Sequence, residues 1–158
     1  MKNIQTELKW SVLFTAMSIA WIFLEKLVGL HDELIEHHPI YTNLYAIPAI
    51  LFYILALKEK KANFYKSHFK YKNAVVSGLI LTFMITLLAP LSTYVSVEYV
   101  SPDFFENAII KSVKMNYYTT EEATEYFNTS NYMLQSLIFT PVFGIVTTLI
   151  VAIFVRSK

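Results

Sequence analysis

A run of thirty residues without a charged side chain, 126–155, limits the possible folds more than any other feature of this sequence. A soluble helix carries Lys or Glu on its solvent-facing side, so no water-soluble core helix needs such a run. A hydrocarbon core of about 30 Å is crossed by roughly 20 helical residues. The run therefore predicts a helix that spans a membrane.

Three further apolar runs give the chain four expected spans. The protein has 158 residues, of which 55% are hydrophobic and 16% charged. Because the charges lie outside a few long segments, this composition is typical of an integral membrane protein. We expect an all-α polytopic membrane protein whose residues 1–158 form a single membrane domain. The expected spans are residues 10–30, 39–57, 73–97 and 132–155.

The positive charges predict how the spans are oriented. Six lysines lie in the loop of residues 58–72, and Lys2, Lys9, Arg156 and Lys158 flank the first and last spans, so ten of the thirteen basic residues share one side. Because cytoplasmic loops carry the excess of Lys and Arg, we expect this loop and both termini in the cytoplasm. The opposite side is acidic.

Composition also excludes several classes of function. The formal net charge is only +1, and topology accounts for the basic residues, so we expect no nucleic acid as a partner. The chain has no cysteine. Disulfides, thiolate catalysis and Cys-ligated metals are therefore excluded.

Residues 98–130, on the acidic side, are too long for a turn and carry helix-start signals. Ser101-Pro102-Asp103 offers an N-cap, a proline at the first helical position and an early acid. The four residues from Thr119 to Glu122 fit a capping box. We expect a short helical hairpin on the outer side between spans three and four. Its aromatic residues suit the headgroup level of a bilayer; they are Phe104, Phe105, Tyr117, Tyr118, Tyr126 and Phe127.

Several segments, in their order along nearly the whole chain, resemble the family called domain of unknown function 4199. They are the run 25–32, Tyr41-Thr42-Asn43 at the start of span two, the corner 102–105, the helix 121–128, and Gly144 in the last span. The members of that family are small bacterial integral membrane proteins without an assigned activity. The resemblance implies a location in the bacterial inner (cytoplasmic) membrane and supplies no catalytic residues.

Histidines and acids gather directly after the first span. If the first helix runs on past Gly29, then Glu25, Asp32 and Glu36 fall on one of its faces. Carboxylate and imidazole groups suit a divalent metal such as zinc or manganese, or a proton relay. A solvated polar turn that caps helix ends explains the same residues. No HExxH spacing is present, so this is not a recognisable metalloprotease site. The candidate metal ligands are His31, Asp32, Glu36, His37 and His38.

Glu25 stands apart because it lies within the expected first span. It follows Trp10 by fifteen residues, which is about 22 Å of helix across a core of about 30 Å. A buried carboxylate costs several kcal/mol unless it is paired, so an intramembrane acid suggests a function. The alternative is a position near the headgroups, with hydroxyl or amide partners such as Tyr41 or Asn43 and with Lys26 extending outward.

Prolines and small residues punctuate the spans. Pro48, Pro90 and Pro141 fall inside spans two, three and four, where they either kink the helices for packing or open a polar path, as in transporters. Ser92, Thr93 and Thr140 beside them are able to line such a path. The pairs Gly78 with Thr82 and Gly144 with Thr148 predict close helix contacts, within the bundle or between protomers. The candidate residues of a buried acid or polar path are Glu25, Lys26, Asn43 and Gln135.

Two of three functions that fit these patterns need no catalysis. The first is a binding, assembly or accessory membrane component whose acidic outer hairpin meets membrane lipid, a second copy of the chain or a larger complex. It predicts that loss of Glu25 matters little, and a set of buried, converging ionisable side chains would contradict it. The second is a small oligomeric carrier or channel for an ion or small solute. It predicts that Glu25, Asn43 and Gln135 face one cavity.

The third function is a metal-dependent membrane enzyme. It predicts that His31, His37 or His38 lies within ligand distance of Asp32 or Glu36. No nucleophile and base pair stands out in the sequence, and four spans leave little volume for a substrate pocket. The sequence therefore favours the first function over the carrier, and the carrier over the enzyme.

Overall fold

A computed structural model describes residues 4–157, apart from the side chain of Ser67. The described residues form helices and turns and no strand. Four of the helical segments are long and apolar enough to cross a membrane. The prediction of an all-α polytopic membrane protein with four spans is confirmed.

The four spans are built from regular and irregular helical pieces. The first is α1 (Gln5–Leu27), and the last is α7 (Thr129–Val155). The third is α4 (Tyr71–Val95) with the π-helical turn η5 (Ser96–Val100). The second, Ile35–Tyr65, consists of η1 (Ile35–His37), α2 (His38–Tyr41), η2 (Thr42–Tyr45), α3 (Ala46–Lys60) and the π-helical turn η3 (Lys61–Tyr65). A short turn, η4 (Lys66–His68), leads to α4, and α5 (Phe104–Lys114) and α6 (Thr120–Tyr126) lie between α4 and α7.

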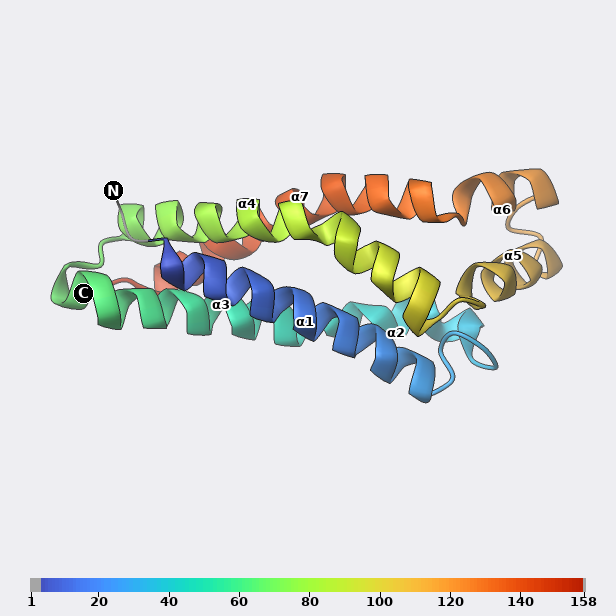
Figure 1. Cartoon of the computed structure of the whole chain (residues 1–158), viewed down its shortest axis with the longest axis horizontal. Coiled ribbons are helices and arrows are strands. Elements are labelled where there is room, and N and C mark those ends of the chain that lie inside the picture. The colour runs from blue at the N-terminus through green and yellow to red at the C-terminus, as the bar shows by residue number, and fades with distance from the viewer. Residues whose placement is uncertain (1–3, 158) are drawn as a thin grey trace.

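The long helices run side by side, as Figure 1 shows. At one end of this bundle α1 begins, α7 ends and α3 turns into α4; we call it the terminal end. The connection between α1 and α2 lies at the opposite end, together with α5 and α6; we call this the hairpin end (Figure 1). The lysine-rich loop therefore lies at the same end as both described termini.

Helices α4 and α7 pack most closely, through two reciprocal contacts. A Cβ atom on Gly78 would overlap with the side chain of Thr148, and one on Gly144 would overlap with that of Thr82. Each glycine of one helix thus accommodates a threonine of the other, which is how small residues let membrane helices approach each other. Both contacts lie within a single chain.

The buried face of α1 is more polar than its outward face. The buried residues of α1 are Glu7, Ser11, Phe14 and Glu25. Its exposed side chains include Leu8, Val12, Leu13, Phe23 and Leu24. Apolar groups facing outward suit a lipid environment, in which buried polar groups must find partners inside the protein.

The three prolines differ in their effect. Pro90 and Pro141 lie inside α4 and α7, and α4 changes direction in its second half (Figure 1), as an interior proline allows. Pro48 is the third residue of α3. Its missing N–H falls in the first turn of α3, where the 3₁₀ turn η2 passes into regular α-helix. The expected interruption inside span two is therefore placed at the start of a regular helix.

Candidate metal centre at the hairpin end

The centre begins where α1 stops. The helix ends at Leu27 and does not run past Gly29, which has a φ of 81°, in the left-handed region that favours glycine. The backbone N–H of Leu30 donates to the carbonyl of Glu25 at 2.9 Å, and that of Leu34 donates to Gly29 at 2.8 Å. The chain thus folds back, and the single helical face expected for Glu25, Asp32 and Glu36 does not form.

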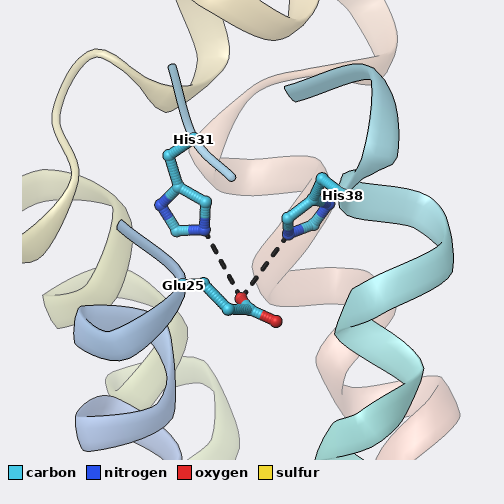
Figure 2. A group of neighbouring side chains, drawn as sticks. All are labelled: Glu25, His31 and His38. Carbon is cyan, nitrogen blue, oxygen red and sulfur yellow. Dashed lines mark hydrogen bonds and ion pairs between the residues drawn. The ribbon is translucent and has the colours of Figure 1, made fainter. Parts of the chain in front are cut away.

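This turn brings His31 over Glu25 while α2 supplies His38 (Figure 2). One carboxylate oxygen, Oε2 of Glu25, lies 3.4 Å from Nε2 of His31 and 3.6 Å from Nε2 of His38. Glu25 and His31 are each 2% exposed, and the His38 side chain is 20% exposed. Three potential metal-ligand atoms therefore meet at a largely buried point.

Neighbouring groups hold these side chains in place. The indole Nε1–H of Trp21 donates to the other carboxylate oxygen of Glu25 at 2.6 Å. Nδ1 of His31 is hydrogen-bonded to Oγ of Ser101 at 2.9 Å, and the ring of Phe104 lies 4.8 Å and 5.1 Å from the two imidazole rings. When Nδ1 of His31 donates to Ser101, its Nε2 lone pair faces Glu25. Such outer contacts orient metal ligands.

A cavity of about 310 Å³ lies beside the centre. His31 and His38 form part of its wall, and the residues that flank Pro90 and Pro141 contribute hydroxyl groups. The hydroxyl-bearing residues of its lining are Thr15, Ser18, Thr42, Tyr45, Ser92, Thr93, Ser96, Ser101, Tyr132, Ser136 and Thr140. The two histidines therefore adjoin a space inside the bundle whose wall is mostly apolar and carries these hydroxyl groups.

Comparison with known proteins places the chain in a family. The family described as "protein of unknown function (DUF4199)" matches residues 9–157. The chain belongs to the DUF4199 family. The resemblance noted in the sequence is thus confirmed over nearly the whole length. Neither the curated proteins nor the solved structures that were compared with the chain gave a match.

Of the five candidate metal ligands in this DUF4199 protein, the structure brings only His31 and His38 together. Oδ1 of Asp32 accepts a hydrogen bond from the side chain of Asn107 at 3.0 Å. Glu36 is exposed and pairs with Lys111 at 2.6 Å. His37, although adjacent to His38 in sequence, is exposed and lies 3.6 Å from Glu36. The third member of the group is Glu25, a candidate for a buried acid or polar path.

The other polar-path candidates do not share a cavity with Glu25. The ammonium of Lys26 donates to the backbone carbonyl of Val100 at 2.8 Å. The side-chain amide of Asn43 is exposed and donates to the carbonyls of Pro39 and Ile40. Gln135 is half-buried and is not among the residues that line the cavity beside the histidines. Asn43 lines a neighbouring cavity, but neither of these two cavities brings Glu25, Asn43 and Gln135 together.

Sequence reasoning missed the groups around the centre and a second buried cluster. Ser101 was expected to cap a helix, but α5 begins at Phe104, and Ser101 is buried against His31. At the terminal end, Glu7 forms an ion pair with Lys60 at 2.9 Å and accepts a hydrogen bond from Ser77. Glu7 and Lys60 are 3% and 4% exposed. Lys60 and Ser77 are distant from Glu7 in the sequence, so no local pattern predicts these contacts. The eighteen residues from Glu7 to Glu25 make about five helical turns, and this spacing indicates that both glutamates lie on one face of α1.

The chemistry of the three donors fits a zinc-like ion. One carboxylate oxygen and two imidazole nitrogens are a ligand set that Zn²⁺ accepts. Three protein ligands, rather than four, leave one position for water or another ligand. The arrangement is therefore suited to reversible or reactive binding more than to a closed structural site.

Proposed function

We propose that this DUF4199 protein binds a divalent transition-metal ion, best represented by Zn²⁺, through Glu25, His31 and His38. The centre lies within the membrane domain, near the hairpin end. The excess of Lys and Arg at the terminal end supports a cytoplasmic position for that end. The family resemblance supports a bacterial inner membrane as its location.

The observation that carries the proposal is the spacing of the donor atoms. The Oε2–Nε2 separations of 3.4 Å and 3.6 Å are longer than good hydrogen bonds, which measure about 2.7–3.2 Å. Ligands about 2.0–2.1 Å from a tetrahedral zinc ion lie roughly 3.3 Å from each other. The two separations from the carboxylate therefore match those between ligands of one ion better than those of hydrogen-bonded partners, and the three donor atoms all lie within 4.8 Å of one another.

Burial supports the same conclusion. A carboxylate held away from water needs a counter-charge. A divalent cation between the three donors would supply it. Trp21 occupies the second carboxylate oxygen, which directs the free oxygen toward both histidines.

A binding, assembly or accessory role remains the second candidate. A groove of about 660 Å³ at the hairpin end supports it, because its lining includes exposed aromatic residues, among them Tyr117 and Tyr118. The buried convergence of Glu25, His31 and His38 weighs against that role as we first framed it, since it needed no such set. An enzyme would use the same metal centre, and we assign it no reaction.

The test is a zinc titration of the purified protein in detergent micelles. We expect isothermal titration calorimetry to give one Zn²⁺ per chain for the wild type. His38→Ala and Glu25→Gln should each weaken binding at least tenfold, because each removes a ligand. His37→Ala is the matched control, since the neighbouring His37 faces Glu36, and it should bind as the wild type does. Equal effects of His37→Ala and His38→Ala, or no stoichiometric binding, would overturn the proposal.

A further inference from the structure

We propose that the protein carries the divalent cation across the membrane along the buried polar face of α1. In this scheme the metal centre is the loading site, and the cluster of Glu7, Lys60 and Ser77 is the closed gate at the terminal end. This inference rests on the proposed function, because the metal centre supplies the cargo. It adds a direction of movement and a second site.

The first argument is the spacing of the two buried carboxylates. Glu7 and Glu25 are eighteen residues apart on one helix, which is about five turns and about 27 Å. They therefore lie on the same face and near the two limits of a hydrocarbon core of about 30 Å. Ser11 and Ser18 lie on this face between them, and Ser18 is hydrogen-bonded to the hydroxyl of Tyr45 at 2.6 Å. A membrane helix with polar groups along its buried face has the pattern of a pathway.

The second argument is the space inside the hairpin half of the bundle. The cavity beside the histidines shares wall residues, including Thr42, Tyr45 and Thr140, with a second cavity of about 440 Å³. The second cavity extends to Tyr53, whose hydroxyl is hydrogen-bonded to Thr82 at 2.9 Å. The two cavities together extend from the metal centre to the middle of the membrane domain, where the second also opens on the outer face of the bundle beside the exposed Phe143, Val146 and Ile150.

The third argument is the closure of the terminal half. Below the second cavity, Tyr53, Thr82 and Thr148 form a buried hydroxyl cluster. Leu57 and Leu81 are 1% exposed beside it. Closer to the terminal end, the ammonium of Lys60 forms an ion pair with the carboxylate of Glu7. A transported cation would need to replace this ammonium in order to bind Glu7. The cavities thus lie in the hairpin half of the bundle while the terminal half is closely packed, an asymmetry expected for one state of a carrier.

The helix geometry marks the same two places. The π-helical turn η3 directly follows Lys60, and the π-helical turn η5 contributes Ser96 and Val97 to the cavity beside the metal centre. Such turns are rare and are frequent at functional sites. Each of the two buried clusters thus has an irregular helical turn beside it, where a helix can change its length or direction.

The test is zinc uptake into liposomes that contain the purified full chain and a trapped zinc-sensitive dye, with valinomycin and K⁺ to balance charge. We expect uptake at least tenfold above that of protein-free liposomes for the wild type. Glu7→Gln should reduce uptake at least tenfold while Zn²⁺ binding in micelles is unchanged. Glu59→Gln is the matched control, because Glu59 lies at the same end but pairs with Lys9 near the surface; its uptake should equal the wild type's.

The outcomes separate the two proposals. Stoichiometric Zn²⁺ binding without uptake would overturn the carrier and leave the metal centre standing, whereas absence of binding would remove both. Uptake by Glu7→Gln at the wild-type rate would show that Glu7 is not on the path and would overturn the gate. If Glu7→Gln does not fold, Ser77→Ala keeps the ion pair and removes only the hydroxyl. Unchanged uptake by that variant would likewise contradict the gate.

Discussion

Each end of the bundle buries a glutamate of α1, but the groups around the two carboxylates differ. At the terminal end, Glu7 is paired with the permanent cation of Lys60 at 2.9 Å. At the hairpin end, Glu25 faces two imidazoles at 3.4 Å and 3.6 Å, beside a cavity. One carboxylate is neutralised by the chain, and the other is surrounded by groups that are able to bind a cation.

This difference shows how to distinguish a buried charge that the chain itself neutralises from a site that is able to bind a cation. A pair in direct contact holds the surrounding helices together, and removing one partner leaves an uncompensated charge. A loosely spaced set beside an accessible space has room for something else. The predictions below test this contrast, and they run from the largest expected effect to the smallest.

Lys60→Met should have the largest effect on stability. It leaves Glu7 buried without its cation, at an expected cost of about 3–5 kcal/mol in the free energy of unfolding. The double variant Glu7→Gln with Lys60→Met should recover most of the loss. Denaturant unfolding in micelles measures both. The control, Lys9→Met, breaks the exposed pair with Glu59 and should cost about 0–1 kcal/mol. If Lys60→Met costs no more than this control, the buried ion pair of Glu7 and Lys60 does not stabilise the fold as expected.

Gly78→Ala should have the next largest effect, because the new Cβ overlaps with Thr148. Forcing α4 and α7 apart should lower the free energy of unfolding by about 1–3 kcal/mol. Adding Thr148→Ala removes the opposing atoms and should restore part of the loss, so that the two changes are not additive. The same unfolding assay reports the coupling. Strict additivity would mean that the two side chains do not meet.

Trp21→Phe should weaken Zn²⁺ binding at the metal centre without affecting the ion pair of Glu7 and Lys60. Loss of the indole hydrogen bond frees the second oxygen of Glu25, and we expect Zn²⁺ affinity to fall about tenfold, as for other groups that orient ligands. Trp10→Phe is the matched control, because its indole donates to Glu59 at the opposite end, and it should bind Zn²⁺ normally. In that control Trp21 is the remaining tryptophan, so its emission should change on zinc addition.

Glu122→Gln should have the smallest effect, confined to α6. The backbone N–H and the hydroxyl of Thr119 donate to the Glu122 carboxylate and hold its pKa below the ordinary value of 4.5. A lowered folded-state pKa stabilises the helix above the ordinary value, and this contribution is lost as the pH falls through the lowered pKa. The protection factors of the α6 amides, which correct for the intrinsic pH dependence of exchange, should fall in acid for the wild type, whereas the variant should show the lower protection already near neutral pH.

The arrangement of spans could be predicted because lipid leaves the chain few choices. Long uncharged runs must be helical, and local signals were sufficient for the capping box at Thr119, which the structure contains. The first helix was less predictable at its end. Gly29 is a helix-stop signal, but the position of the folded-back chain also depends on contacts with distant segments, such as the hydrogen bond from Asn107 to the carbonyl of His31.

The membership of the candidate site was predictable only in part, for the same reason. Residue type singled out His31, His37 and His38 equally. The three histidines have different surroundings in the structure. Helix α2 directs His38 inward and leaves His37 beside Glu36. His31 is covered by Ser101 and Phe104, some seventy residues away in the sequence. The buried pair of Glu7 and Lys60 joins residues 53 positions apart. The periodicity of the sequence indicates which face of a helix is buried, but it does not indicate which residue of another helix contacts that face.

The polar inner face of α1 also bears on how the protein is made. With a mean hydropathy of 1.3 in its most apolar window, against 2.5 for α7, α1 is the least apolar of the four spans and precedes the others in the chain. During synthesis α1 reaches the bilayer before Lys60 is available to neutralise Glu7 and before α2 brings His38 next to Glu25. We expect α1 to insert poorly by itself and to complete its insertion only when the later helices arrive, so biogenesis of this protein depends on cooperation between its first and later spans.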